Sequence, residues 1–223
     1  MNTISSNLET IWQTLPSGVQ LVAVSKFHPV EAIQLAYDAG QRIFGESRQQ
    51  EIETKHTQLP DDIEWHFIGH LQTNKVKFLV PYVHTIESVD SLKLLREIEK
   101  QASEQALNVE CFLEIHIANE SEKYGFTTQE CTDFLATGEW REYKGVTIAG
   151  LMGMATFTDD REEIRREFRF LKDYFKTLKS SYFADRDSFK HISMGMSNDY
   201  KIAIEEGSTL VRIGTSIFGE REY

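Results

Sequence analysis

The sequence contains few of the residues that crosslink small secreted domains or bind zinc. It has only two cysteines, Cys111 and Cys131, and their spacing fits neither a zinc motif nor a redox motif. Each lies within an apolar or helical pattern, so we expect two buried thiols and no disulfide, which suits a reducing compartment. Residues 1–15 lack the basic start and the apolar stretch of a signal peptide. We therefore expect a cytoplasmic protein.

Long apolar runs and an excess of positive charge are also missing. No apolar stretch approaches the roughly 20 residues that a helix needs to cross a bilayer. Acidic residues (35) outnumber lysine and arginine (24), and the net charge is −11. This charge argues against nucleic acid and anionic membranes as partners, because both attract clustered positive charge. A hydrophobic fraction of 40% nevertheless predicts a folded protein with a sizeable core.

A regular alternation of short β-branched segments and amphipathic segments fills the chain. No linker rich in proline, glycine or serine interrupts it, so we expect one domain over residues 1–223. After a first helix at 4–15, strands are predicted at 19–24, 43–44, 65–68, 84–87, 110–117, 146–152, 191–194 and 210–213. Helices are predicted between them at 29–39, 47–59, 75–79, 91–107, 128–137, 161–179 and 199–206.

This alternation predicts the fold class. Strands that alternate with helices form parallel sheets, and eight such units in about 220 residues are typical of a closed barrel. The predicted fold is therefore α/β, a single (β/α)₈ TIM barrel with an extra N-terminal helix. An open flavodoxin-like or Rossmann sheet is the alternative, but such a sheet would use fewer units. In a barrel of this kind, functional groups lie at the carboxyl ends of the strands.

Three strand ends carry residues suited to binding a reactive anion. Lys26 follows the first strand, where partial burial and nearby positive charge would make an amine nucleophilic toward an aldehyde. Met196 and Ser197 follow the seventh strand, and Gly214 and Thr215 follow the eighth, the positions that often hold phosphate in barrels. The alternatives are a surface lysine at a strand end and ordinary turns, with Ser197 capping the next helix.

Two polar residues lie within predicted strands. Arg212 stands between apolar neighbours, and a guanidinium that points into the barrel needs a partner. That partner is either a ring nitrogen of a ligand or a carboxylate such as Glu46 or Glu114. His66 is interpreted as a core histidine. Because no third ligand stands at metal spacing from His66 and His70, we predict no metal site.

These segments, in this order, resemble the pyridoxal phosphate homeostasis protein family. The resemblance runs along nearly the whole chain and rests on motifs at 22–26, 44–46, 65–69, 71–72, 74–75, 88–91, 123, 125–126, 150–152, 193–197, 211–215 and 217–219. It implies a barrel similar to the N-terminal domain of alanine racemase, with pyridoxal 5′-phosphate (PLP) bound as a Schiff base on Lys26. It also implies that Met196, Ser197, Gly214 and Thr215 hold the phosphate.

The resemblance further assigns two residues to the ring of the cofactor. Arg212 matches the residue near the pyridine nitrogen, and Ser47 stands where the family usually has asparagine. An arginine beside that nitrogen keeps it unprotonated, which weakens the electron sink needed for carbanion chemistry. The family therefore implies intracellular PLP (vitamin B6) homeostasis, in which the protein stores PLP, shields its aldehyde and delivers it to apo-enzymes.

Two alternatives to a PLP carrier stay open. One is a PLP-dependent enzyme similar to an amino-acid racemase, which needs a base on each face of the substrate α-carbon. Racemases of this fold take one base from a second domain or a partner subunit, and here only Tyr124 and His66 are candidates. The other alternative is an interaction module that keeps the barrel without the cofactor. Because the predicted outer helices show no apolar seam, we expect a monomer.

Overall fold

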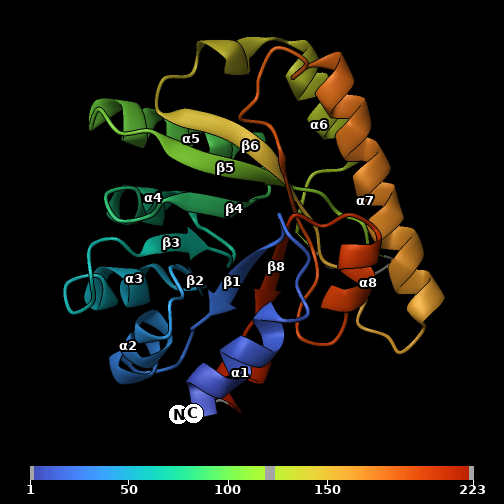
Figure 1. Cartoon of the computed structure of the whole chain (residues 1–223). Helices are drawn as coiled ribbons and strands as arrows, with labels where there is room; N and C mark the ends of the chain where they lie inside the picture. Colours follow the sequence, from blue (N-terminus) through green and yellow to red (C-terminus); the bar gives the residue numbers. More distant parts are fainter. Residues whose placement is uncertain (1–2, 119–123, 221–223) are drawn as a thin grey trace.

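The computed structural model describes residues 3–118 and 124–220 of the chain. The strands in this part are β1 (Gln20–Val24), β2 (Ile43–Glu46), β3 (Glu64–Phe67), β4 (Thr85–Val89), β5 (Val109–Glu114), β6 (Val146–Met152), β7 (His191–Ser193) and β8 (Leu210–Ile213). Each strand pairs in parallel with the next, and β8 pairs with β1, so the sheet closes into a barrel. Figure 1 shows β1 and β8 side by side, with the other strands following in sequence order.

Helices connect the strands and cover the outside of the barrel. They are α1 (Thr3–Trp12), α2 (Val30–Asp38), α3 (Gln49–Lys55), α4 (Val76–Leu79), α5 (Leu92–Glu104), α6 (Thr128–Ala136), α7 (Arg161–Ser181), α8 (Tyr200–Glu205) and α9 (Thr215–Phe218), with the 3₁₀ helices η1 (Thr73–Lys75) and η2 (Glu139–Glu142). Helix α1 precedes the barrel, and its Asn7 side chain donates a 3.0 Å hydrogen bond to the Ile217 carbonyl in α9. The predicted (β/α)₈ barrel with an extra N-terminal helix is confirmed.

The element boundaries agree with the prediction to different degrees. The bounds of β6 and β8 match the prediction, whereas β2 extends two residues beyond the predicted 43–44. The polar helix predicted at 47–59 is shorter, since α3 begins two residues later and ends four residues earlier. The segment after β8 also contains a helix that was not predicted, α9, which begins directly after Gly214.

The core has two layers because strands of a closed barrel are buried on both faces. The larger layer lies between the strands and the surrounding helices. The smaller layer fills the inside of the barrel and consists of Val22, Phe112, Ala149, Met152 and Leu210. Both cysteines are buried and unpaired, as predicted. Burial raises the pKa of the Cys131 thiol to about 11, which keeps it in its unreactive protonated form.

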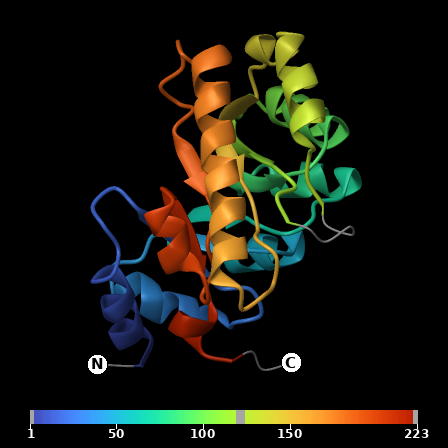
Figure 2. The same cartoon turned by 90° about the vertical axis from the view of Figure 1, so that its right-hand side faces the viewer.

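The longest helix, α7, runs along one side of the barrel with α8 beside it (Figure 2). It begins at Asp160, whose side chain accepts hydrogen bonds from the backbone of Glu162 and Glu163. Its inner face buries Phe168 and Leu171 completely against the strands. Neither α7 nor any other helix in the described ranges is long and apolar enough to cross a membrane.

Replacing Leu171 by alanine tests the importance of this outer layer. The substitution leaves a cavity between α7 and the sheet, so we expect the free energy of unfolding to fall by about 3 kcal/mol. The exposed Leu35 on α2 provides a matched control, for which we expect less than about 1 kcal/mol. Urea unfolding of both variants measures the difference. Equal losses would show that α7 does not pack as described.

Candidate functional site

The closed barrel brings the predicted site residues to one opening. Lys26 and Ser47 follow β1 and β2, which pair with Val24 opposite Gly45. On the other side, β1 pairs with β8, and a side-chain Cβ at Gly214 would lie 3.0 Å from the carbonyl oxygen of Val24. The carboxyl ends of β7, β8, β1 and β2 therefore stand next to each other around one mouth.

Lys26 occupies a tight turn directly after β1. The backbone N–H of His28 donates a 3.1 Å hydrogen bond to the Ser25 carbonyl, which closes the turn. Phe27, at the third position, has a φ of 68°, a left-handed conformation that is strained for a bulky residue. A positive φ at this position is typical of a type II turn. Lys26 is half-buried, and the turn fixes the backbone conformation on either side of it.

A buried cluster, which we call the Lys26 clamp, holds this turn and consists of Glu46, Glu51 and Lys55. The Lys55 ammonium lies 2.8 Å from Glu46 Oε1 and 2.7 Å from Glu51 Oε2, and it donates to the Ser25 carbonyl at 3.2 Å. The Ser25 hydroxyl donates to Glu46 at 2.6 Å, and the Phe27 N–H donates to Glu51 at 3.0 Å. The residues before and after Lys26 are thus both tied to the clamp.

The two carboxyl groups of the clamp have different proton affinities. Burial raises the pKa of Glu46 to about 7, although the Lys55 charge and the hydrogen bonds from Lys55 and Ser25 lower it. For Glu51, the hydrogen bonds from Lys55 and Phe27 outweigh burial and lower its pKa. Glu46 Oε2 is buried and has no partner among the described residues, so it is the oxygen that can carry a proton near neutral pH.

The loops after β7 and β8 present hydrogen-bond donors at the same mouth. The backbone N–H groups of Ser197, Asn198, Thr215 and Ser216 meet no acceptor within the described part of the chain. The side-chain hydroxyls of Ser197 and Thr215 are half-buried and exposed, respectively, and also make no hydrogen bond there. Uncommitted N–H and O–H donors on two adjacent loops suit an anion such as phosphate, and Ser197 and Thr215 of the predicted phosphate residues are among these donors.

The loop after β7 differs from the prediction in one respect. Ser197 does not cap the next helix, because Asp199 occupies the N-cap position of α8. The Asp199 carboxylate instead accepts a 2.6 Å hydrogen bond from the backbone N–H of Met196. Burial raises the pKa of Asp199, although its hydrogen bond with Met196 and the charge of Arg212 lower it. Gly195, with a φ of 95°, allows the chain to turn here.

Arg212 points into the barrel, a direction that the sequence left open, and only 4% of it is exposed. Its Nη1 lies 3.6 Å from Glu87 Oε2 and donates a 2.5 Å hydrogen bond to the Ser193 hydroxyl, while Nη2 donates to the Gly153 carbonyl at 3.2 Å. The carboxylate partner is therefore Glu87, and the expectation of Glu46 or Glu114 was wrong. The Glu46 side chain faces Lys55 of α3, outside the barrel, and it is Glu87 of β4 that lies within ion-pair distance of Arg212.

The two candidate bases named from the sequence are placed differently. His66 is a buried core histidine whose Nδ1 lies 2.6 Å from Glu87 Oε1, and it lines a cavity at the opposite opening of the barrel from Lys26. Tyr124 is 57% exposed and stacks on His70 with ring centroids 4.0 Å apart. Lys123, which belongs to one of the sequence motifs, lies outside the described residues.

Three residues that hold the site in place were not predicted from the sequence: Glu51, Lys55 and Glu87. Glu51 and Lys55 stand four residues apart in a predicted helix, a spacing that brings opposite charges together on one face. That signal was present in the sequence, but it reads equally well as an exposed surface pair. Glu87 lies between buried residues of β4, and an acidic residue in a fully buried strand needs a buried partner.

Comparisons with known proteins agree with this geometry. Residues 1–222 match the family model described as alanine racemase, N-terminal domain. The pyridoxal phosphate homeostasis protein of Aquifex aeolicus is 39% identical over 206 residues, which covers 92% of this chain and 88% of that protein. PipY of Synechococcus elongatus, solved with PLP bound, superposes with a TM-score of 0.88 at 34% identity and covers 97% of this chain and all of its own.

More distant structures share the fold alone. Alanine racemase of Clostridium difficile superposes with a TM-score of 0.76 at 15% identity, and the match spans 99% of this chain but 56% of the racemase. The fold and the lysine-bearing mouth thus define a barrel of the alanine racemase N-terminal domain class. Within that class, the chain belongs to the pyridoxal phosphate homeostasis protein family.

The raised pKa of Glu46 predicts a specific pH dependence of stability. The folded protein binds a proton at Glu46 more tightly than the unfolded chain does, so this contribution to stability is complete below about pH 4.5 and is lost as the pH rises to about 7. Its upper limit is about 3 kcal/mol. We expect Glu46→Gln to lose less free energy of unfolding between pH 5 and pH 8 than the wild type does.

Chemical denaturation at several pH values measures this difference, with the exposed Glu104→Gln as the matched control. Burial also raises the pKa of Glu114 to about 7, but its contribution is common to all three proteins and cancels in the comparison. Parallel pH profiles for Glu46→Gln and wild type would contradict the assignment of this proton to Glu46.

Proposed function

We propose that this protein binds pyridoxal 5′-phosphate as a Schiff base on Lys26 and serves in intracellular PLP homeostasis rather than in catalysis. The observation that carries the proposal is that the clamped Lys26 turn and two donor-rich loops share one barrel mouth. Relatives that cover most of the chain are named pyridoxal phosphate homeostasis proteins, and PipY was solved with PLP. These findings support the same ligand for this chain.

Lys26 supplies the covalent attachment in this proposal. The aldehyde of PLP offers an electrophilic carbon, and condensation with the unprotonated amine forms a C=N bond and releases one water. The turn of residues 25–28 directs the amine, and the Lys26 clamp keeps that turn in place. Exchange with another amine reverses the attachment, which allows the protein to deliver PLP to apo-enzymes.

The other residues of the mouth hold the rest of the cofactor. Ser197 and Thr215 bind the phosphate through backbone N–H groups and hydroxyls, and Met196 and Gly214 form the adjoining parts of the two phosphate loops. Arg212, which stays charged because a guanidinium does not release its proton in proteins, lies near the ring nitrogen. A permanent positive charge there disfavours ring protonation, so the electron sink that racemases need is weak. The Ser47 hydroxyl lies near the ring, in place of the usual asparagine.

We also propose the domain organisation, oligomeric state, location and partners of the protein. Residues 1–223 form one PLP-binding TIM-barrel domain that acts as a monomer in the cytoplasm. Apo forms of PLP-dependent enzymes are the partners, because they consume the cofactor that the protein stores. Nucleic acid and membranes are not partners, since the net charge of −11 repels anionic surfaces.

The first test is the visible absorbance of the protein loaded with PLP. We expect the wild type to show a Schiff-base band that sodium borohydride bleaches, and Lys26→Ala to lack it. The loaded wild type should also restore activity to an apo form of a PLP-dependent enzyme, with no amino-acid turnover of its own. Absorbance spectroscopy and a coupled reactivation assay measure these properties.

Lys100→Ala, which removes an exposed lysine on α5, is the matched control and should behave as the wild type. A band of equal intensity in Lys26→Ala would contradict the covalent site. Racemisation or decarboxylation of amino acids by the wild type, abolished in Lys26→Ala, would instead establish an enzyme and refute the carrier role.

The phosphate loops yield a separate prediction about ligand selectivity. Ser197→Ala combined with Thr215→Val removes two hydroxyls that can donate to the phosphate, and hydrogen bonds to charged groups contribute about 1.5–3 kcal/mol each. We expect affinity for PLP to fall by about 10-fold or more, whereas affinity for pyridoxal, which lacks the phosphate, stays unchanged. Spectroscopic titration measures both constants. An equal loss for both ligands would show that these hydroxyls do not contact the phosphate.

A further inference from the structure

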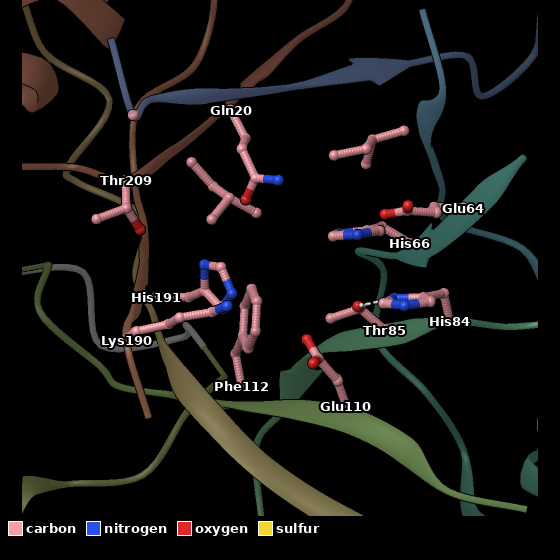
Figure 3. Close-up of a pocket in the computed structure, with 13 residues that line it drawn as sticks. Gln20, Glu64, His66, His84, Thr85, Glu110, Phe112, Lys190, His191 and Thr209 are labelled. Carbon is pink, nitrogen blue, oxygen red and sulfur yellow. Dashed lines mark hydrogen bonds between the residues drawn. The ribbon is translucent and has the colours of Figure 1, made fainter. Parts of the chain in front are cut away.

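A second cavity opens at the amino ends of the strands, opposite the Lys26 mouth. Its volume is about 530 Å³, and its walls include Gln20, Glu64, His66, His84, Glu110 and His191. Figure 3 shows Glu64, His66 and His84 together on one side, with Lys190 and His191 facing them across the opening. None of these six wall residues belongs to the proposed PLP site, so the cavity is a separate feature of the barrel.

Three metal-ligand side chains converge in this cavity. One ligand atom each of Glu64, His66 and His84 lies within 4.8 Å of the others. Glu64 and His66 are two residues apart on β3 and therefore share one face of the strand. His84 comes from the neighbouring chain segment, whose backbone N–H donates a 2.9 Å hydrogen bond to the Trp65 carbonyl. The three side chains therefore come together because the segment of His84 pairs with β3, and not because of their spacing along one strand.

Both imidazole rings are held by their Nδ1 atoms. His66 Nδ1 lies 2.6 Å from Glu87 Oε1, and His84 Nδ1 lies 2.8 Å from the Thr85 hydroxyl. Neither Nε2 has a hydrogen-bond partner among the residues that the structure describes. A carboxylate behind a histidine is the usual support of a metal ligand, because it fixes the ring and the tautomer. Since Nδ1 faces Glu87, Nε2 lies on the other side of the His66 ring, away from Glu87.

The charges around the cavity favour a cation. Glu64 and Glu110 carry negative charge on its wall, and Lys190 is the one lysine or arginine among its lining residues. The net charge of these three groups is negative. Two imidazoles and one carboxylate are also the ligand set of open zinc sites, in which water takes a fourth position. Imidazole nitrogen favours zinc and similar transition ions over magnesium or calcium.

We propose that Glu64, His66 and His84 form a binding site for a divalent transition-metal ion of the zinc class. Tetrahedral zinc with bonds of about 2.1 Å places its ligand atoms about 3.4 Å apart, so the three groups must move inward. Glu64 and His84 are exposed at the rim and free to make this movement, while the buried His66 serves as the fixed point. The prediction of no metal considered only spacing within one strand, and this proposal replaces it.

The buried carboxylate behind His66 also connects the two ends of the barrel. Glu87 meets His66 through Oε1, and it meets Ser193 and Arg212 through Oε2. A cation on Nε2 keeps the His66 proton on Nδ1, directed at Glu87. The proposed metal site and the guanidinium of the Lys26 mouth are therefore two ends of one hydrogen-bonded chain through the barrel.

Zinc titration of the full chain, prepared without a histidine tag and without added PLP, tests the site. We expect calorimetry to show one Zn²⁺ bound per chain. Outer-shell partners alone contribute about 10- to 100-fold to metal affinity, so loss of a direct ligand in His84→Ala should weaken binding by at least about 100-fold. Glu64→Gln should weaken it by at least about 10-fold. Co²⁺ should give the wild type a visible ligand-field band that His84→Ala lacks.

His56→Ala, which removes an imidazole outside the cavity, is the matched control and should bind Zn²⁺ as the wild type does. Because Glu64 and His84 are exposed, their variants should keep the far-ultraviolet circular dichroism of the wild type. Failure of the wild type to take up Zn²⁺ would overturn the proposal. Equal affinity in wild type, His84→Ala and Glu64→Gln would also overturn it, since the ion would then bind elsewhere.

Discussion

The pairing of β8 with β1 is the interaction on which the rest of the structure depends. In an open sheet of eight strands about 4.8 Å apart, the first and last strands would be separated by more than about 30 Å. Closure instead sets Ala23 opposite Ile213 and brings Gly214 against Val24. The lysine of one strand end and the donor loops of the last two strands can then contact a single small ligand, which neither could hold alone.

Buried charges, both inside the barrel and between its strands and helices, set the directions of the functional side chains. Removing a charge from water costs several kcal/mol unless a partner compensates it, so each buried charge restricts the position of its neighbours. Lys55 and Glu46 are paired in this way beneath the Lys26 turn. Glu87 likewise meets Arg212 on one side and His66 on the other. We interpret these pairs as positioning devices, because apolar residues would stabilise the same barrel without fixing the turn or the guanidinium.

Patterns along the chain predicted the fold and the location of the mouth, but not the partners across the barrel. The predicted bounds of β6 and β8 match the structure, and alternation within β8 predicted that Arg212 points opposite to Val211 and Ile213. Its partner Glu87 lies on β4, more than 120 residues away in the sequence, and no local pattern encodes such a contact. His84 joins His66 only because β3 and β4 are neighbours. Local periodicity therefore reveals which residues face inward, while three-dimensional pairing decides which of them meet.

The central claim of this account is that Lys26, and no other lysine, carries the cofactor. The most direct measurement is peptide mapping by mass spectrometry after PLP-loaded wild-type protein has been reduced with borohydride. The account predicts one stoichiometric pyridoxyl phosphate modification, on the peptide that contains Lys26. Lys55, the buried lysine beside that turn, should stay unmodified because its side-chain nitrogen is enclosed by contacts with Glu46, Glu51 and the Ser25 carbonyl. A modification on Lys55, or one spread over surface lysines with Lys26 unlabelled, would contradict the account.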